Sequence, residues 1–524
     1  MRPWLVAAIL FGALSVLFVL TAPANRTESD DGYQFAYEIE QGTASHGTAR
    51  HVAFVPVMHG AYLAVRATGV TEDAQLVATM VNSLLAAAAV ALQFLLLRLR
   101  LGLSTLSSLL GAGLLAAAYG FWRFAAEVEV YPLALATGLL AVFAAFSPRA
   151  TTPWRIAGTA GLAAVAVSAY TANALLAFAV IPVYLLVARR PRHLVLYGAV
   201  LLPALVLTVA IPYLAVRQPG ESISEAYGAA EGTPIGPESF LKAGVGAGQA
   251  MLSSGFLFSY PGFADELSAR IPDRAISDEI YLAETVGTAR RATMTATFVV
   301  ALVAVLTAIV LAVPGLARSW REPAVAALLV WLGGVVGFQI LRSDTADGPE
   351  LWLLALPPLL MLITVGVAGR ESTVARDTTV LAVLLAALVL HNGSGMSLIQ
   401  DERGDRNAAR AAWLLDNAGP ADTILTVDSS LFHRYLQYHS DASVVFLVDA
   451  VIAGEDLAGL LVTGGQGGAV FATSDVFDPP GYLEYQDPDR YRALVGFGES
   501  VASQFTKVDD DEFGGVYRLD AAGA

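Results

Sequence analysis

The sequence predicts a mainly α-helical, polytopic membrane protein that ends in a small α/β domain. Of its 524 residues, 56% are hydrophobic and only 15% are charged, and the mean hydropathy is +0.59. Soluble proteins of this length are far less apolar. The apolar residues form long runs separated by short loops as far as about Asp401. Beyond this residue the pattern changes to short alternating helical and strand-like segments.

The long apolar runs set the expected number of membrane spans. A membrane-crossing helix needs about 20 mainly apolar residues. Eleven stretches meet this description, near 4–20, 74–97, 102–120, 130–146, 155–169, 173–188, 194–215, 295–317, 323–341, 351–368 and 377–391. The first lacks a small-residue cleavage site directly after its apolar run, so we interpret it as an anchor and not as a cleaved signal peptide.

The basic residues predict the orientation of these spans, because cytoplasmic loops carry an excess of Lys and Arg. If the N-terminus is inside, every inside loop is basic, with Arg98, Arg100, Arg149, Arg155, Arg189, Arg190, Arg192, Arg318, Arg321, Arg370 and Arg376. We therefore predict a multi-pass protein of the cell membrane with a cytoplasmic N-terminus. Its transmembrane domain would cover residues 1–392, with long outside loops at 21–73 and 216–294.

The first outside loop opens with two adjacent carboxylates, Asp30 and Asp31, a few residues after the first span. A carboxylate held near a reacting hydroxyl can act as a general base, although an acidic, solvated loop would look the same. The loop also contains His46, His51 and His59. Their spacing supplies no i, i+4 pair for a zinc site, and His51 is the candidate for a polar contact with substrate.

A second group of ionisable residues lies at the outer end of the third span and the start of the fourth. Arg123, Glu127 and Glu129 are surrounded by apolar and aromatic residues, and Tyr131 follows them. Ionisable groups at membrane depth are costly and are normally paired or functional. The alternative is that they only cap the helices and reach toward the membrane interface.

Two further outside turns contain candidate contacts to substrate. The turn from Tyr170 to Asn173 is short and polar, and Arg342 stands beside acids in a turn that could bind phosphate. Two sequons, at Asn25 and Asn392, also fall on the predicted outside face.

The last part of the chain, 393–524, is predicted to be a soluble, acidic, extracytoplasmic α/β domain. Between His391 and Ala524 there are 21 acidic and 8 basic residues, which gives −13 of the total charge of −15. This acidity argues against a nucleic-acid partner. Helical runs at 407–417 and 431–438 alternate with strand-like runs at 423–427 and 444–448. The glycine-rich 464–468 lacks the strand–turn–helix context of a nucleotide site and is interpreted as a loop.

These features together resemble the C-type glycosyltransferases, which have the GT-C fold. The resemblance rests on Asp30-Asp31-Gly32-Tyr33 after the first span, on the motif from Ala126 to Leu133, on the Tyr170–Asn173 turn and on the terminal outside domain. Within that class the motifs are similar to the protein O-mannosyltransferase-like branch. The segments 414–417, 423–428 and 435–437 are also similar to the terminal domain of that branch.

The resemblance implies a reaction and a set of roles. The donor would be a sugar, mannose for this branch, linked to polyprenyl or dolichyl phosphate. The acceptor would be a hydroxyl of a protein, glycan or lipid on the extracytoplasmic face. Asp30 would be the base and Asp31 its neighbour or alternate, and Glu127 or Glu129 would orient acceptor or sugar. Where this branch often has His, the chain has Thr171 and Asn173.

The role of binding the donor phosphate has to be assigned to other residues, because this His is absent. Arg123 or Arg342 could bind the donor phosphate in place of the missing His. The residues indicate no particular cofactor, and the use of a divalent metal stays open. Two other classes of protein are alternatives. A transporter or flippase of a lipid-linked saccharide would have inverted repeats and charges at mid-membrane, and an anchored binding protein would not need eleven spans.

Overall fold

The computed structural model describes residues 2–24, 31–43, 50–147, 152–216, 236–341, 347–368, 374–428, 430–454, 457, 459, 461 and 468–519. The chain divides into two compact units. Unit 1 comprises Met1–Pro23, Glu38–Ser254 and Gly287–Gln400, and unit 2 comprises Ala24–Tyr37, Gly255–Val286 and Asp401–Ala524. Parts of both long outside loops therefore group with the C-terminal segment, and the division lies at 400/401, whereas the sequence placed it at 392/393.

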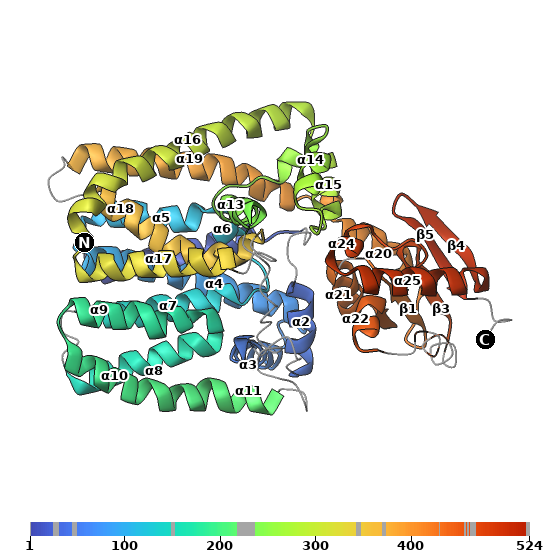
Figure 1. Ribbon diagram of the computed structural model, residues 1–524, viewed down its shortest axis with the longest axis horizontal. Coiled ribbons are helices and arrows are strands. Elements are labelled where there is room, and N and C mark those ends of the chain that lie inside the picture. Colours follow the sequence, from blue (N-terminus) through green and yellow to red (C-terminus); the bar gives the residue numbers. More distant parts are fainter. Residues whose placement is uncertain are drawn as a thin grey trace. The chain divides into compact units, whose positions relative to one another are not determined.

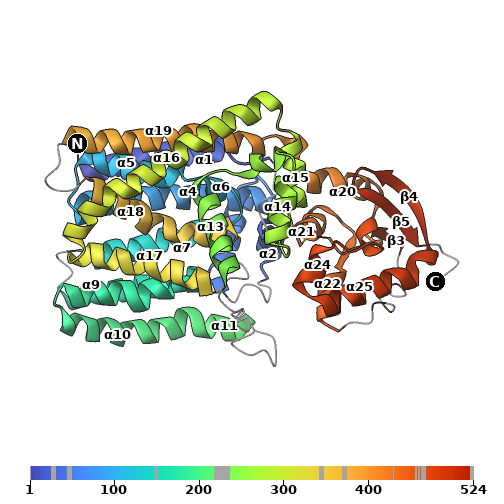
Figure 2. The ribbon, with the colours of Figure 1, turned by 45° about the horizontal axis from the view of Figure 1, so that its top comes forward.

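Unit 1 is a bundle of roughly parallel and antiparallel helices (Figures 1 and 2). Its main helices are α1 (Pro3–Leu20), α3 (Phe54–Arg66), α4 (Ala74–Leu95), α5 (Thr105–Ala117), α6 (Tyr119–Ala125), α7 (Tyr131–Ala145), α8 (Pro153–Ala169), α9 (Ile181–Val187), α10 (Pro191–Leu205), α11 (Ile211–Val216), α13 (Pro237–Met251), α16 (Thr288–Ser319), α17 (Pro323–Leu341), α18 (Leu356–Val367) and α19 (Val374–Ile399). Short 3-10 or π segments extend several of them, namely η2 (Leu96–Arg100), η3 (Thr171–Asn173), η4 (Leu176–Val180), η5 (Val206–Ala210) and η7 (Pro349–Ala355).

The predicted class, a mainly α polytopic membrane protein, is confirmed. All eleven predicted stretches are helical. Among the described residues, seven helices are long and apolar enough to cross a membrane, and an eighth is counted if α5 and α6, bent by 70°, form one span. The sequence count was higher because three of its stretches, at 131–145, 153–169 and 171–187, fold as shorter helices. Each of the three packs against longer helices of the bundle: α7 on α4, α8 on α10, and α9 with η4 on α17.

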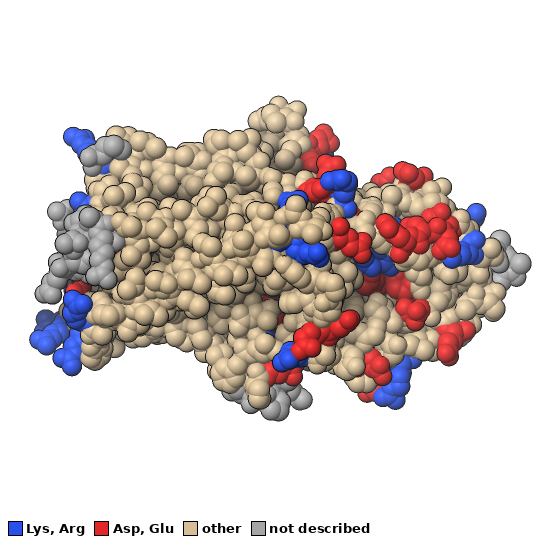
Figure 3. Space-filling view, turned by 90° about the horizontal axis from the view of Figure 1, so that it is seen from above, with Lys and Arg blue, Asp and Glu red and all other residues tan. Residues whose placement is uncertain are grey.

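The exposed surface of the bundle is apolar, as expected of a protein in contact with lipid. Of the apolar 18-residue stretch within α16, only 17% is buried. Of the corresponding stretch that contains α18, 78% is buried. Val299, Val303, Leu306 and Val310 of α16 are exposed. On the face that Figure 3 shows, the middle of the bundle is a band of uncharged residues.

Unit 2 contains a five-stranded sheet and several short helices. The strands are β1 (Thr423–Thr426), β2 (Ser443–Phe446), β3 (Val470–Thr473), β4 (Phe505–Asp511) and β5 (Gly514–Leu519), in the order β2-β1-β3-β5-β4. The first three are parallel and β5 is antiparallel to both neighbours. The helices are η6 (Gly255–Ser259), α14 (Phe263–Arg270), α15 (Ser277–Glu284), η8 (Glu402–Gly404), α20 (Arg406–Asn417), α21 (Ser430–His439), α22 (Leu447–Ile452), η9 (Ser474–Val476), α24 (Tyr482–Gln486), α25 (Pro488–Val501) and η10 (Ala502–Gln504), and α2 (Gly32–Gln41) begins here and ends in unit 1.

Apolar residues of both faces of this sheet explain why the segment folds. One cluster contains Leu425, Val448 and Phe497, and another contains Ile424, Phe432 and Leu436. Adjacent residues of β1, Ile424 and Leu425, thus point to opposite faces, as strand geometry requires. The predicted α/β alternation is confirmed, because α20, β1, α21 and β2 lie within one residue or two of their expected bounds.

Candidate functional site

A buried ion pair lies where α6 ends and the turn to α7 begins. Arg123 is in the last turn of α6, and Glu127 follows one helical turn later, so the two side chains can meet. The Arg123 Nε to Glu127 Oε1 distance is 2.8 Å, and both side chains are inaccessible to solvent. Charges are taken out of water only at a cost of several kcal/mol each, so a buried guanidinium and carboxylate must compensate one another.

The backbone of this turn is held by polar side chains of α4. Asn82 donates through Nδ2 to the carbonyl oxygens of Glu127 and Glu129, both at 2.7 Å, and Ser83 Oγ donates to the carbonyl of Ala125 at 3.2 Å. The turn therefore has a defined conformation although it is not helical. Glu129 is also almost completely buried, at 4% exposure, whereas Glu127 has none.

Aromatic rings connect this turn to the segment before α3 and to the turn after α8. Tyr131, the first residue of α7, packs edge-on against Tyr170 with ring centroids 5.5 Å apart, and Tyr170 packs against His51 at 5.8 Å. His51 lies before α3 and is buried. This burial, with a smaller effect of neighbouring Arg50, lowers the pKa of His51 to about 3. The imidazole is therefore neutral at physiological pH.

The structure brings together four of the residues predicted for substrate or catalysis, namely Arg123, Glu127, Glu129 and Tyr131, and the ring contacts join His51 to them. Asn173 is used differently. It is buried, and its Nδ2 donates to the carbonyls of Ala134 at 3.1 Å and Ala166 at 2.9 Å. Its amide donors thus tie α7 to α8.

A second polar cluster in unit 1 was not predicted. Asn392 of α19 is fully buried, donates to the carbonyls of Ala117 and Met251, and accepts from the Ser253 N–H at 3.0 Å. Its neighbour His391 is hydrogen-bonded to the Ser253 carbonyl at 2.8 Å. The Asn392 amide that would carry a glycan is therefore enclosed, and the outside location of this sequon stays a prediction. A polar His-Asn pair inside an apolar run was the signal that could have indicated this burial.

Asp31 belongs to unit 2, where its carboxylate forms an ion pair with Arg434 of α21. The Asp31 side chain is 42% exposed and that of Arg434 22%. The adjacent Tyr33 packs against Tyr435, with ring centroids 5.1 Å apart. The beginning of α2 thus contacts α21 through one ion pair and one ring contact.

Other predicted residues lie outside the described part of the chain, namely Asp30, Arg342, His46, Asn25 and most of the 464–468 loop. Within the described ranges, no group of three or more His, Asp or Glu side chains is arranged to hold a metal ion.

No protein-family model and no curated protein sequence matches the chain. Solved structures do. ArnT from Cupriavidus metallidurans bound to undecaprenyl phosphate aligns over 98% of both chains, with a TM-score of 0.56 at 13% identity. Its apo state aligns over the same share, with a TM-score of 0.53. The Archaeoglobus fulgidus oligosaccharyltransferase aligns over 97% of this chain and 72% of its own, at 11% identity and a TM-score of 0.48.

At 13% identity, the likeness to ArnT concerns the fold alone, and it extends over nearly the whole chain. The O-mannosyltransferase-like branch stays a prediction. The chain has the GT-C fold that the resemblance implied.

Proposed function

We propose that this chain is a membrane glycosyltransferase that moves a sugar from a polyprenyl- or dolichyl-phosphate donor to a hydroxyl acceptor. One observation carries the proposal. The chain shares its fold from end to end with ArnT, a protein whose structure holds undecaprenyl phosphate, and its buried acids and arginine lie at one turn of that fold. An apolar bundle suits a donor that is itself dissolved in the membrane.

The reaction needs a base on one side of the sugar and charge stabilisation on the other. The acceptor oxygen forms a bond to the anomeric carbon while the bond from that carbon to the phosphate oxygen breaks. The hydroxyl proton passes to a carboxylate, and the polyprenyl phosphate leaves with the electron pair. We assign the base to Asp30, as the resemblance implies, with Asp31 as the alternate. The ion pair of Asp31 with Arg434 favours Asp30.

The acids of the second motif have different roles in this proposal. Glu127 is compensated by Arg123 and inaccessible to solvent, which suits a residue that holds the turn in place. Glu129 follows two residues later on the same braced turn and retains a small exposed area. We assign it to the hydroxyls of the sugar, with Tyr131 and His51 along the aromatic contacts beside it. Because the charge of Arg123 is used by Glu127, Arg342 is the better candidate for the donor phosphate.

The positions of the arginines support the proposed orientation. Arg100 ends η2, Arg189 and Arg190 connect α9 to α10, and Arg318 lies in the last turn of α16. Figure 1 shows these helix ends at the same end of the bundle, and Figure 3 shows Lys and Arg side chains gathered there. By the positive-inside rule this end faces the cytoplasm. The turn with Glu127 and Glu129 would then face outside, at the cell membrane.

The test uses the full chain in liposomes with labelled polyprenyl-phosphate sugars, mannose first. We expect sugar transfer to an added protein, glycan or lipid acceptor, strong loss in Asp30→Asn and Glu129→Gln, and full activity in Glu72→Gln. Glu72 is the matched control, because it is an exposed acid of the same outside region. For Glu127→Gln we expect the transfer activity to fall in proportion to the amount of folded protein.

One result would reject the assignment of the base, and another would reject the transferase itself. Transfer that persists in Asp30→Asn and Asp31→Asn, singly and together, removes the paired acids from the base role. Movement of an intact lipid-linked saccharide across the liposome membrane, without any glycosylated acceptor, would identify a flippase instead.

A further inference from the structure

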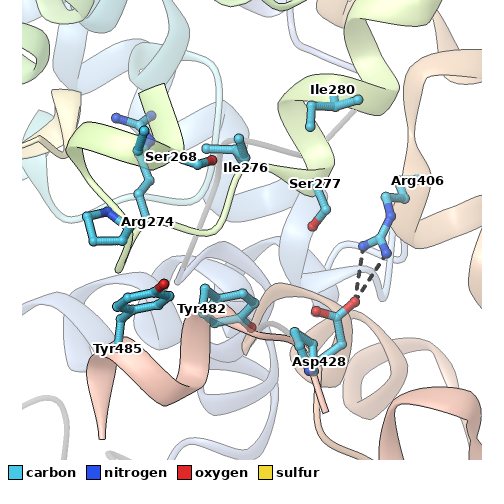
Figure 4. Close-up of a pocket in the computed structure, with 12 residues that line it drawn as sticks. Ser268, Arg274, Ile276, Ser277, Ile280, Arg406, Asp428, Tyr482 and Tyr485 are labelled. Atoms are coloured by element: carbon cyan, nitrogen blue, oxygen red, sulfur yellow. Dashed lines mark hydrogen bonds and ion pairs between the residues drawn. The ribbon is translucent and has the colours of Figure 1, made fainter. Parts of the chain in front are cut away.

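Unit 2 contains a cavity of about 570 Å³, a volume within the range of small-molecule sites. Its lining comes from two stretches far apart in sequence. Residues around α14 and α15 form one wall, and α24 with the start of α20 and the end of β1 forms the other (Figure 4). None of the proposed catalytic residues lines it. We propose that this cavity binds a neutral saccharide.

The first argument is the aromatic wall. Tyr482 and Tyr485 both line the cavity, and they are three residues apart on α24, so that both lie on one face of the helix. Tyr482 is partly buried and packs against the core of the domain, whereas the Tyr485 side chain is 66% exposed. Each ring offers a flat apolar face with a hydroxyl group at its edge. The C–H face of a sugar ring stacks on such a surface.

The second argument is the charge balance. Two guanidinium groups line the cavity, but each already has acidic partners. Arg406 pairs with Asp428 at 3.2 Å and with Asp278 at 3.1 Å, and Arg274 pairs with Glu279 at 3.1 Å. Each cation is thus matched by a carboxylate even when Asp278 carries a proton, so the wall has no positive surplus to attract a phosphate or carboxylate ligand.

The third argument is the kind of hydrogen bond that the walls provide. Charged groups already fixed by one another present both donors and acceptors in a rigid arrangement. Ser268 and Ser277 add hydroxyl groups from the opposite wall (Figure 4). Sugar hydroxyls donate and accept at once, and therefore match a surface that alternates the two. Ile276, Ile280, Pro272 and Pro480 fill the remainder with apolar surface.

The ion pairs of this wall continue into a buried network. Arg410 joins Asp428 to Asp475 behind the cavity, and all three side chains are at least nine-tenths buried. Burial raises the pKa of Asp278 to about 7. Near neutral pH its carboxyl can therefore carry a proton, which adds a donor close to Arg406.

The saccharide would belong to the acceptor, and this second step rests on the proposed function. The binding of a saccharide in the cavity does not rest on the proposed function. The two can therefore fail separately: binding without transfer would reject the transferase, and transfer without binding would reject the cavity as an acceptor site.

Binding is measured on the full chain in phospholipid nanodiscs, because sugar-headed detergents would compete. The probes are mannobiose and cellobiose, with inorganic phosphate and an acidic peptide for comparison. Saturation-transfer NMR detects the binding of each probe. We expect binding of a disaccharide that Tyr485→Ala weakens at least about tenfold and that Tyr485→Phe retains. The control is Tyr281→Ala. Tyr281 is on α15 but outside the cavity, where it packs against Phe513.

Hydrogen exchange provides the second readout. A bound disaccharide should protect amides at 268–280 and 480–486 in the wild type and not in Tyr485→Ala. Disaccharide binding that is indifferent to Tyr485, absence of disaccharide binding at millimolar concentration, or Tyr485-dependent binding of phosphate or peptide instead would each overturn the proposal.

Discussion

The two units solve the problem of buried charge in different ways. Unit 1 buries an arginine and a glutamate that lie one helical turn apart, Arg123 and Glu127, with the buried Glu129 two residues further on. Unit 2 encloses a chain of five residues, Asp278, Arg406, Asp428, Arg410 and Asp475, drawn from three distant parts of the sequence.

The difference follows from the surroundings. In an apolar bundle a charge has few other partners, so Glu127 takes its counter-ion, Arg123, from one helical turn away. In the α/β unit, backbone N–H groups at the ends of the strands also stabilise the buried carboxylate. Asp475 accepts from Val427 N and Asp428 N as well as from Thr426 Oγ1. This network can therefore hold one more carboxylate than guanidinium groups.

The largest effect is expected from breaking the pair in unit 1. Arg123→Leu would leave the Glu127 carboxylate buried without its counter-ion and should lower the free energy of unfolding by about 3–5 kcal/mol. The double variant Arg123→Leu, Glu127→Leu should recover most of that loss. Unfolding of the full chain in lipid measures both. A double variant as unstable as the single one would show that the pair is not the compensating unit.

A pH-dependent effect is expected from Asp278. Its folded pKa of about 7 is above its ordinary value of 3.8, so the folded state binds the proton more tightly than the unfolded chain. The stabilisation is complete below about pH 4 and is lost as pH rises through 7, by roughly 4 kcal/mol at most. Burial lowers the pKa of His433 to about 4, which acts in the opposite direction between pH 4 and 6.5.

Comparison with Asp278→Asn separates these two contributions, because the variant keeps His433. Amide exchange of unit 2 in nanodiscs, corrected for intrinsic rates, should show that the wild type loses stability between pH 5 and 8 relative to the variant. Parallel curves for the two proteins would mean that Asp278 does not titrate in this range.

A smaller loss is expected for Arg410→Met in unit 2. Asp475 would retain its bonds from Thr426, Val427 and Asp428, so the cost should be about 2–3 kcal/mol, near that of a hydrogen bond to a charged group. The same exchange experiment measures it. A loss larger than that of Arg123→Leu would contradict the idea that backbone donors share the charge.

The smallest effect is expected at the half-exposed pair of Asp31 and Arg434. Solvent screens such pairs, so Arg434→Ala should change the free energy of unfolding by less than about 1 kcal/mol. Thermal unfolding followed by circular dichroism suffices to measure it. A change of several kcal/mol would indicate that this contact fixes the start of α2.

The same contrast explains what the sequence could predict. The membrane class, the helices and the Arg123–Glu127 motif depend on local spacing, and each was predicted. The network of unit 2 depends on tertiary contacts between residues 278, 406 and 475, which no local pattern contains. One signal did exist: Asp428 follows β1 and Asp475 follows β3, and parallel neighbours end at the same edge of a sheet. The burial of Asn392 was missed because a sequon is read from three residues alone.

The most direct test of the proposed transfer counts products in a single turnover. A doubly labelled donor, with one label on the sugar and another on the polyprenyl phosphate, is incubated with the full chain in liposomes and a hydroxyl acceptor. The proposal predicts one free polyprenyl phosphate for each glycosylated acceptor, and neither in Asp30→Asn. Donor that keeps both labels together, whether it stays in place or crosses the membrane, would contradict it.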